Sequence, residues 1–143
     1  MLSLVWQQLD QQQVKFRRQR SADLVKSSTG KAVIAALATV SPGTDLVVQG
    51  YLGFSMVQAL CRLYQVPVSD LEIQQLLKRT ARDRDKTLPL LLAIAGNGLK
   101  AFPGVGTVAG GFMHAVAYGM IFDALGKAVA RTLELQGELS PVF

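Results

Sequence analysis

The sequence predicts an all-α fold: a helical bundle of two apolar helical hairpins, each bent at a Pro-Gly pair, with a connecting amphipathic helix. The Pro-Gly pairs Pro42-Gly43 and Pro103-Gly104 interrupt apolar runs of helical length. No segment alternates apolar and polar residues between hairpin turns, so we expect no sheet. Only 17% of the 143 residues are charged, against roughly 25% in a typical soluble domain. The chain therefore carries more apolar surface than one core of this size requires.

Residues 1–30 are expected to form an amphipathic, basic lead-in helix outside the core. Its first apolar residues give way to glutamines and then to a basic cluster, which includes Arg17, Arg18 and Arg20. The run from Ser27 to Gly30 predicts a break, because its hydroxyl groups can cap a following helix. The helical-hairpin domain would then span residues 31–136, followed by a tail at residues 137–143.

The first hairpin is expected to turn at Pro42 and Gly43, because proline removes a backbone donor and stops the preceding helix. Thr44 or Asp45 can cap the next helix, which is apolar on nearly all sides. For Asp45, a cap is favoured over a catalytic or transport role, since a carboxylate beside long apolar runs is costly unless it has a partner.

The segment Ser69-Asp70-Leu71-Glu72 matches a capping box, in which the serine hydroxyl and the glutamate carboxylate each satisfy a first-turn amide. It predicts an amphipathic helix from Asp70 to about Arg82, with an apolar stripe formed by Leu71, Ile73, Leu76 and Leu77. A second basic cluster lies on the other side of this helix, with Lys78, Arg79 and Arg82. Both clusters suit an anionic surface, either phospholipid head groups or nucleic acid, or else they are solvated helix faces.

The last helix, from about Thr107 to Leu135, has small residues at four-residue spacing on one ridge. These residues, counted from the second hairpin tip, are Gly106, Gly110, Gly111, Ala115 and Gly119. Such a ridge lets a second helix approach closely, either in a membrane or in a tightly packed bundle. Residues 101–122 hold no formal charge if His114 is neutral. This uncharged stretch is long enough for a transmembrane candidate.

The chain offers no constellation for catalysis. His114 is the only histidine and Cys61 the only cysteine, so neither a zinc site nor a His-dependent triad can be assembled. The segment around Gly30-Lys31 departs from a nucleotide-binding P-loop at both flanking positions. We therefore expect no enzyme, no cofactor and no metal, and we expect Asp123 to pair with Lys127 at the i+4 position.

Length limits how the first hairpin could enter a bilayer. Residues 31–41 comprise 11 residues, or about 16 Å of helix, which cannot cross about 30 Å of hydrocarbon. The basic clusters before and between the hairpins would share the cytoplasmic side if both hairpins dip in and return. These patterns predict association with the cytoplasmic face of a membrane.

The stretch from Lys31 to Glu134 resembles the bacterial domain of unknown function found in YcjF-like membrane proteins and at the C-terminus of Era-like GTPases. The likeness lies in three short segments: residues 41–46 (SPGTDL), 63–69 (LYQVPVS) and 102–107 (FPGVGT). The resemblance implies a helical, membrane-associated module that often accompanies a GTPase domain. It supplies no catalytic residues.

The function we expect is a membrane-associated anchoring or interaction module without chemistry of its own, working with a GTPase. The alternative is a soluble, self-associating helical bundle that binds or regulates a protein partner, and a homo-oligomer is compatible with either. Nucleic-acid binding is the weaker interpretation of the basic clusters, because no aromatic residues are interleaved with the charges.

Overall fold

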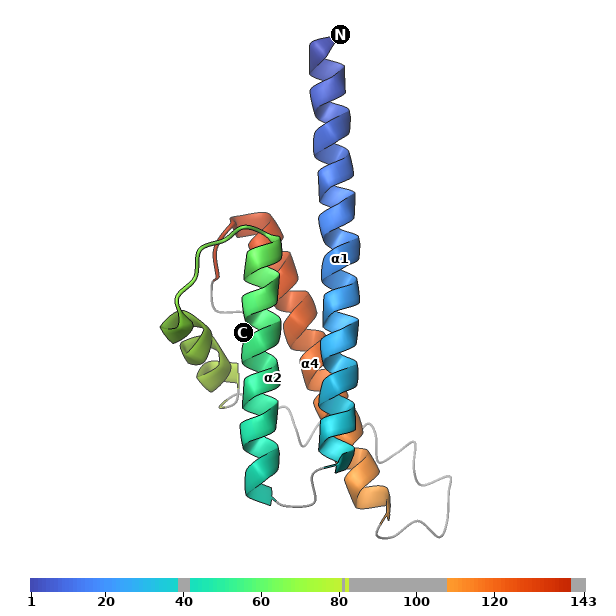
Figure 1. Ribbon diagram of the computed structural model, residues 1–143, viewed down its shortest axis with the longest axis vertical. Coiled ribbons are helices and arrows are strands. Elements are labelled where there is room, and N and C mark those ends of the chain that lie inside the picture. The colour runs from blue at the N-terminus through green and yellow to red at the C-terminus, as the bar shows by residue number, and fades with distance from the viewer. Residues whose placement is uncertain (39–41, 81, 83–107, 140–143) are drawn as a thin grey trace.

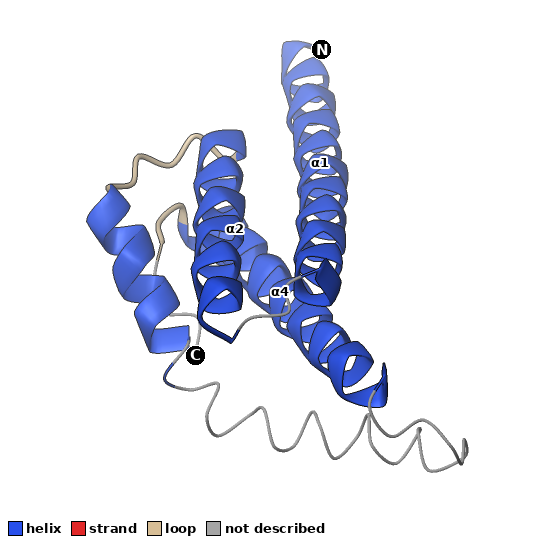
Figure 2. Ribbon diagram, turned by 60° about the horizontal axis from the view of Figure 1, so that its bottom comes forward, coloured by secondary structure: helices blue, strands red, loops and turns tan. Residues whose placement is uncertain are grey.

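The computed structural model describes residues 1–38, 42–80, 82 and 108–139. Its elements in chain order are α1 (Leu2–Ala38), α2 (Pro42–Leu63), a short helix over residues 70–80, and α4 (Val108–Gln136). The described residues form helices and no strand, which confirms the predicted all-α bundle. In Figure 1, α1 and α2 run antiparallel and α4 crosses them. Figure 2 shows the short helix on the side of α2 away from α1.

Helix α1 is continuous, so the predicted break between Ser27 and Gly30 is wrong. A glycine inside a helix costs about 1 kcal/mol relative to alanine, and packing on either side of it offsets that cost. Val25 and Ala32 are both buried. The core therefore begins ahead of residue 31, within the segment expected to be a separate lead-in.

Helix α2 begins at Pro42, ahead of both residues that the sequence offered as its cap. Proline is favoured in the first turn, where its missing N–H would have no helical partner. Thr44 and Asp45 therefore lie inside the first turn, and the predicted role of Asp45 as the cap is wrong. The second hairpin tip, Pro103-Gly104, lies outside the described residues.

The core lies where α1, α2, the short helix and α4 meet. Met56, Val57 and Leu60 of α2 are almost fully buried at its centre. Each helix adds apolar side chains on the face that points to this centre, and these include Val25, Ala32, Ile73, Leu76, Ala115, Phe122, Leu125, Val129 and Leu133.

The capping box at the start of the short helix is confirmed. The backbone N–H of Ser69 donates to Glu72 Oε2 at 2.8 Å, and the backbone N–H of Glu72 donates to Ser69 Oγ at 3.3 Å. Ile73 and Leu76 are buried as expected, but Leu71 is 62% exposed and does not belong to the apolar stripe. The stripe begins at Ile73, two residues later than the sequence suggested.

Two buried polar contacts fix α1 against α2 and against Tyr64, the residue that follows α2. The amide of Gln49 donates to the carbonyl oxygen of Ala32 at 3.0 Å, and the hydroxyl of Tyr64 donates to Ser21 Oγ at 3.3 Å. A buried polar group is costly without a hydrogen-bond partner, so each contact favours one register between the helices.

Candidate functional site

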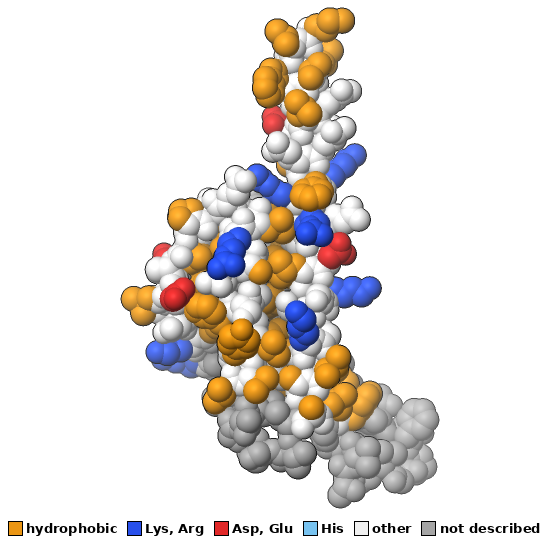
Figure 3. Space-filling view, in the orientation of Figure 1, with side chains coloured by type: hydrophobic (Ala, Val, Ile, Leu, Met, Phe, Trp, Pro, Cys, Tyr) orange, Lys and Arg blue, Asp and Glu red, His pale blue; other side chains and the backbone are white. Residues whose placement is uncertain are grey.

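The first half of α1 extends beyond the rest of the bundle (Figure 1). Its side chains from residue 2 to residue 20 are exposed, apart from a half-buried Arg17. We call residues 2–20 the projecting segment. Figure 3 shows hydrophobic side chains gathered over it, with basic side chains where it joins the bundle.

Five of the seven large apolar side chains in the projecting segment share one side of it, and the other two, Leu4 and Val14, lie outside that side. At about 100° per residue, these five fall within an arc of about 100° on the helix. They are between 44% and 78% exposed, and we call them the outer face: Leu2, Val5, Trp6, Leu9 and Phe16. A contiguous patch of exposed apolar side chains commonly marks a site that binds another protein or a membrane.

The outer face points away from the bundle. The residues by which α1 enters the core lie about 145° around the helix from the centre of the outer face; they are Ser21, Val25, Ala32 and Ala36. Ile34 lies on the same side as the outer face, further along α1, and it is also exposed. A flat surface could therefore lie along the whole of α1 without meeting α2 or α4.

The basic residues predicted to contact an anionic surface fall into two separate places. Arg17, Arg18 and Arg20 lie at the inner end of the projecting segment, whereas Lys78, Arg79 and Arg82 lie at the short helix, across α2. Arg18 has a structural partner that no sequence pattern indicated: its Nε lies 2.6 Å from Glu134 Oε1. That ion pair joins α1 to α4.

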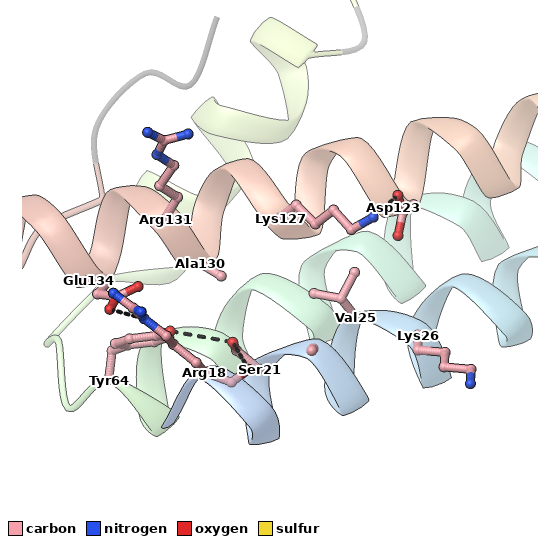
Figure 4. Close-up of a pocket in the computed structure, with 11 residues that line it drawn as sticks. Arg18, Ser21, Val25, Lys26, Tyr64, Asp123, Lys127, Ala130, Arg131 and Glu134 are labelled. Carbon is pink, nitrogen blue, oxygen red and sulfur yellow. Dashed lines mark hydrogen bonds and ion pairs between the residues drawn. The ribbon is translucent and has the colours of Figure 1, made fainter. Parts of the chain in front are cut away.

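A groove runs between α1 and α4, with a volume of about 400 Å³. Figure 4 shows its floor at Val25 and Ala130, and one end of it at the ion pair of Arg18 with Glu134. Lys26 on α1 and Arg131 on α4 stand at its two lips.

A second ion pair lies within α4 beside the groove. Lys127 Nζ lies 2.7 Å from Asp123 Oδ2, which confirms the predicted i+4 pair. Exposed pairs of this type contribute a few tenths of a kcal/mol, about 0.3–0.5. The pair neutralises the charge of Lys127 in the groove wall, and it adds little to the stability of the fold.

The small-residue ridge of α4 packs against α1 at Gly119. A Cβ at that position would lie 2.9 Å from Val33 Cγ2, so only glycine fits without a shift. Ala115 is buried as well. Gly110 and Gly111 lie in the first turns of α4, and Gly106 lies outside the described residues.

Gly126 is a second position where α4 packs closely, and it was not predicted from the sequence. A Cβ there would lie 2.7 Å from both methyl carbons of Val25 and 3.1 Å from Met56 Sδ. Gly126 follows Gly119 after two helical turns, so the ridge continues past the uncharged stretch that drew attention first. The four-residue spacing of the small residues was the available signal, but Gly126 follows Gly119 by seven residues and falls outside a strict four-residue pattern.

Among the described residues, two side chains have shifted pKa values, Cys61 and Glu72. Burial raises the pKa of the Cys61 thiol, with a smaller contribution from Glu72. Hydrogen bonds from Ser69, its backbone N–H first and its hydroxyl second, lower the pKa of Glu72. Among the described residues, no group of His, Cys, Asp and Glu is placed to hold a metal ion.

The described helices also bear on the transmembrane expectation. None of them combines the length and the apolar composition that crossing a bilayer requires. The first part of the uncharged stretch, residues 101–107, lies outside the described residues.

Comparison with known proteins returned no matching family model, no similar curated protein and no similar solved structure.

Proposed function

We propose that this chain is a helical anchoring and interaction module that binds the anionic, cytoplasmic face of a membrane through the outer face of α1. The observation behind this proposal is the projecting segment, whose apolar face points away from the bundle. An interfacial helix combines Trp, Phe and Leu on one face with Lys and Arg beside them. The projecting segment has this composition, with Asp10 as its only acidic residue.

The energetic terms favour binding in the plane of the bilayer. Each large apolar side chain that is half-exposed in water would contribute about 1 kcal/mol on entering the interface, so five contribute on the order of 5 kcal/mol. Arg17 and Arg20, which lie on or beside the outer face, add about 1 kcal/mol each near anionic lipid. The apolar term is the larger, so high salt should weaken binding without abolishing it.

Matched substitutions on the projecting segment test the proposal. We expect Leu9→Gln with Phe16→Gln to weaken co-sedimentation with phosphatidylserine-containing vesicles by at least about tenfold. Val14→Gln is the control, because Val14 is exposed on the same segment but lies on the opposite side of the helix. It should change binding by less than about twofold. Equal losses in both variants, or no sedimentation of the wild type, would exclude this function.

A self-associating bundle is the second candidate, because the outer face of one copy could pair with that of another. Such a contact would run from Leu2 to Phe16, about 21 Å of helix. Light scattering in lipid-free buffer separates the two candidates. Self-association predicts a dimer that the Leu9→Gln, Phe16→Gln variant converts to a monomer, whereas membrane binding predicts a monomer in both cases.

A GTPase partner is part of the same proposal and rests on the family resemblance alone. The module would hold such a partner at the membrane surface. Pull-down of a GTPase that depends on the folded bundle would support this part, and its failure would leave the membrane role untouched.

A further inference from the structure

The groove between α1 and α4 has an uneven charge. It is lined by four basic side chains and two acidic ones: Arg18, Lys26, Lys127, Arg131, Asp123 and Glu134. The two carboxylates are already paired, with Arg18 and Lys127. Lys26 and Arg131 form no ion pair with any described residue. The groove therefore presents two cations that an occupant could neutralise.

The arrangement of these two cations indicates the shape of the occupant. Lys26 and Arg131 lie on opposite lips, and Figure 4 shows their side chains pointing away from each other. They do not converge on one point, as the ligands of a single small anion would. They suit an elongated occupant that carries acidic groups along both of its edges.

The floor of the groove indicates an occupant with a narrow apolar face. It is formed by the small or branched apolar side chains Val25 and Ala130, with Tyr64 at one end, and Ala22 also lines the groove. Its volume of about 400 Å³ has room for a few side chains and not for a whole helix. An occupant would lie across the lips and insert its apolar side chains between α1 and α4.

From this charge and shape we infer that the groove is a docking site for an acidic, amphipathic helical segment of a partner protein. Helix-in-groove recognition places apolar anchors in the groove and charges at its rim. On α1, the groove-lining residues lie on the side opposite to the outer face. A bilayer along the outer face would leave the groove uncovered, so this inference does not depend on the proposed membrane role.

A designed peptide is the probe for this site. We would use a fluorescein-labelled helical peptide built from repeats of Glu-Leu-Ala-Glu-Ala-Leu-Ala, and a second peptide with Gln in place of Glu. Fluorescence anisotropy with the full chain should show binding of the Glu peptide that weakens as salt rises. Binding of the Gln peptide should be at least about tenfold weaker. No binding of the Glu peptide at low salt would overturn the inference.

Charge-reversed variants place the binding in the groove. Lys26→Glu with Arg131→Glu should weaken the Glu peptide by at least about tenfold. Lys31→Glu with Lys78→Glu causes the same change in net charge at exposed positions outside the groove, and it should change binding by less than about twofold. Equal losses would show that binding follows net charge alone, which contradicts the inference.

Misfolding of the groove variant and lipid binding by the groove are each tested separately. If the reversed groove variant fails to fold by circular dichroism, Lys26→Gln with Arg131→Gln replaces it and should show the same selective loss. If the groove variant loses binding to phosphatidylserine vesicles while keeping the peptide, the groove is a lipid contact and the inference is wrong.

Discussion

Gly126 is a glycine at which α4 packs closely against α1 and α2. Gly126→Ala would press a methyl group against Val25, whose β-branched side chain has little freedom to turn aside. Overpacking costs about 1–3 kcal/mol and the gain in helix propensity returns about 1 kcal/mol. We expect a net loss of up to about 2 kcal/mol in the free energy of unfolding, measured in urea.

Gly30→Ala is the control for that prediction. Gly30 is exposed inside α1, and an added methyl group would meet nothing within 4 Å. The substitution should stabilise the protein by roughly 0.5–1 kcal/mol. A loss of stability at Gly30 would mean that the helix breaks there after all.

Glu72 makes the free energy of unfolding depend on pH. Its pKa is lowered in the folded chain, so its stabilising contribution is present above the unfolded value of about 4.3 and is lost as pH falls through the folded pKa. We expect Glu72→Gln to remove this component from the pH dependence of urea unfolding. A pH dependence of urea unfolding that stays as in the wild type after Glu72→Gln would contradict the capping account.

At the scale of elements, local signals in the sequence were reliable when a few neighbouring residues decide the geometry. The capping box at Ser69 and Glu72 and the pair of Asp123 with Lys127 are both contacts within one helical turn. The ion pair of Arg18 with Glu134 joins residues 116 positions apart, and no spacing rule predicts it. Glycine spacing gave Gly119 but stopped short of Gly126.

The continuity of α1 was harder to predict than these local contacts. The run from Ser27 to Gly30 reads as a break because serine and threonine favour caps and glycine disfavours helix. In the bundle, tertiary packing of Val25 and Ala32 outweighs these propensities. The helix also carries two apolar faces on opposite sides, one toward the core and one outward. A single amphipathic pattern over its full length is therefore absent.

The boundary of α2 has a similar cause. Proline stops a preceding helix but is favoured at the start of the next one. Pro42 performs the second role here, because it is the first residue of α2. The sequence could place the hairpin near Pro42, but it could not place the first residue of α2.

At the scale of the whole molecule, the bundle and the projecting segment should be separable. Residues 1–16 contribute no buried side chain. Deleting them should change the free energy of unfolding by less than about 0.5 kcal/mol. The same deletion should abolish vesicle binding, since it removes the outer face. A large loss of stability in urea would show that the segment packs on the bundle.

The account as a whole depends on the outer face of α1 meeting lipid, and Trp6 reports on that directly because it is the only tryptophan in the chain. Its fluorescence should be measured while phosphatidylcholine vesicles, with and without phosphatidylserine, are added, using lipids brominated at different depths. We predict a blue shift and quenching by shallow bromines with the anionic vesicles. An emission spectrum that stays that of an indole in water, without quenching, would contradict the account.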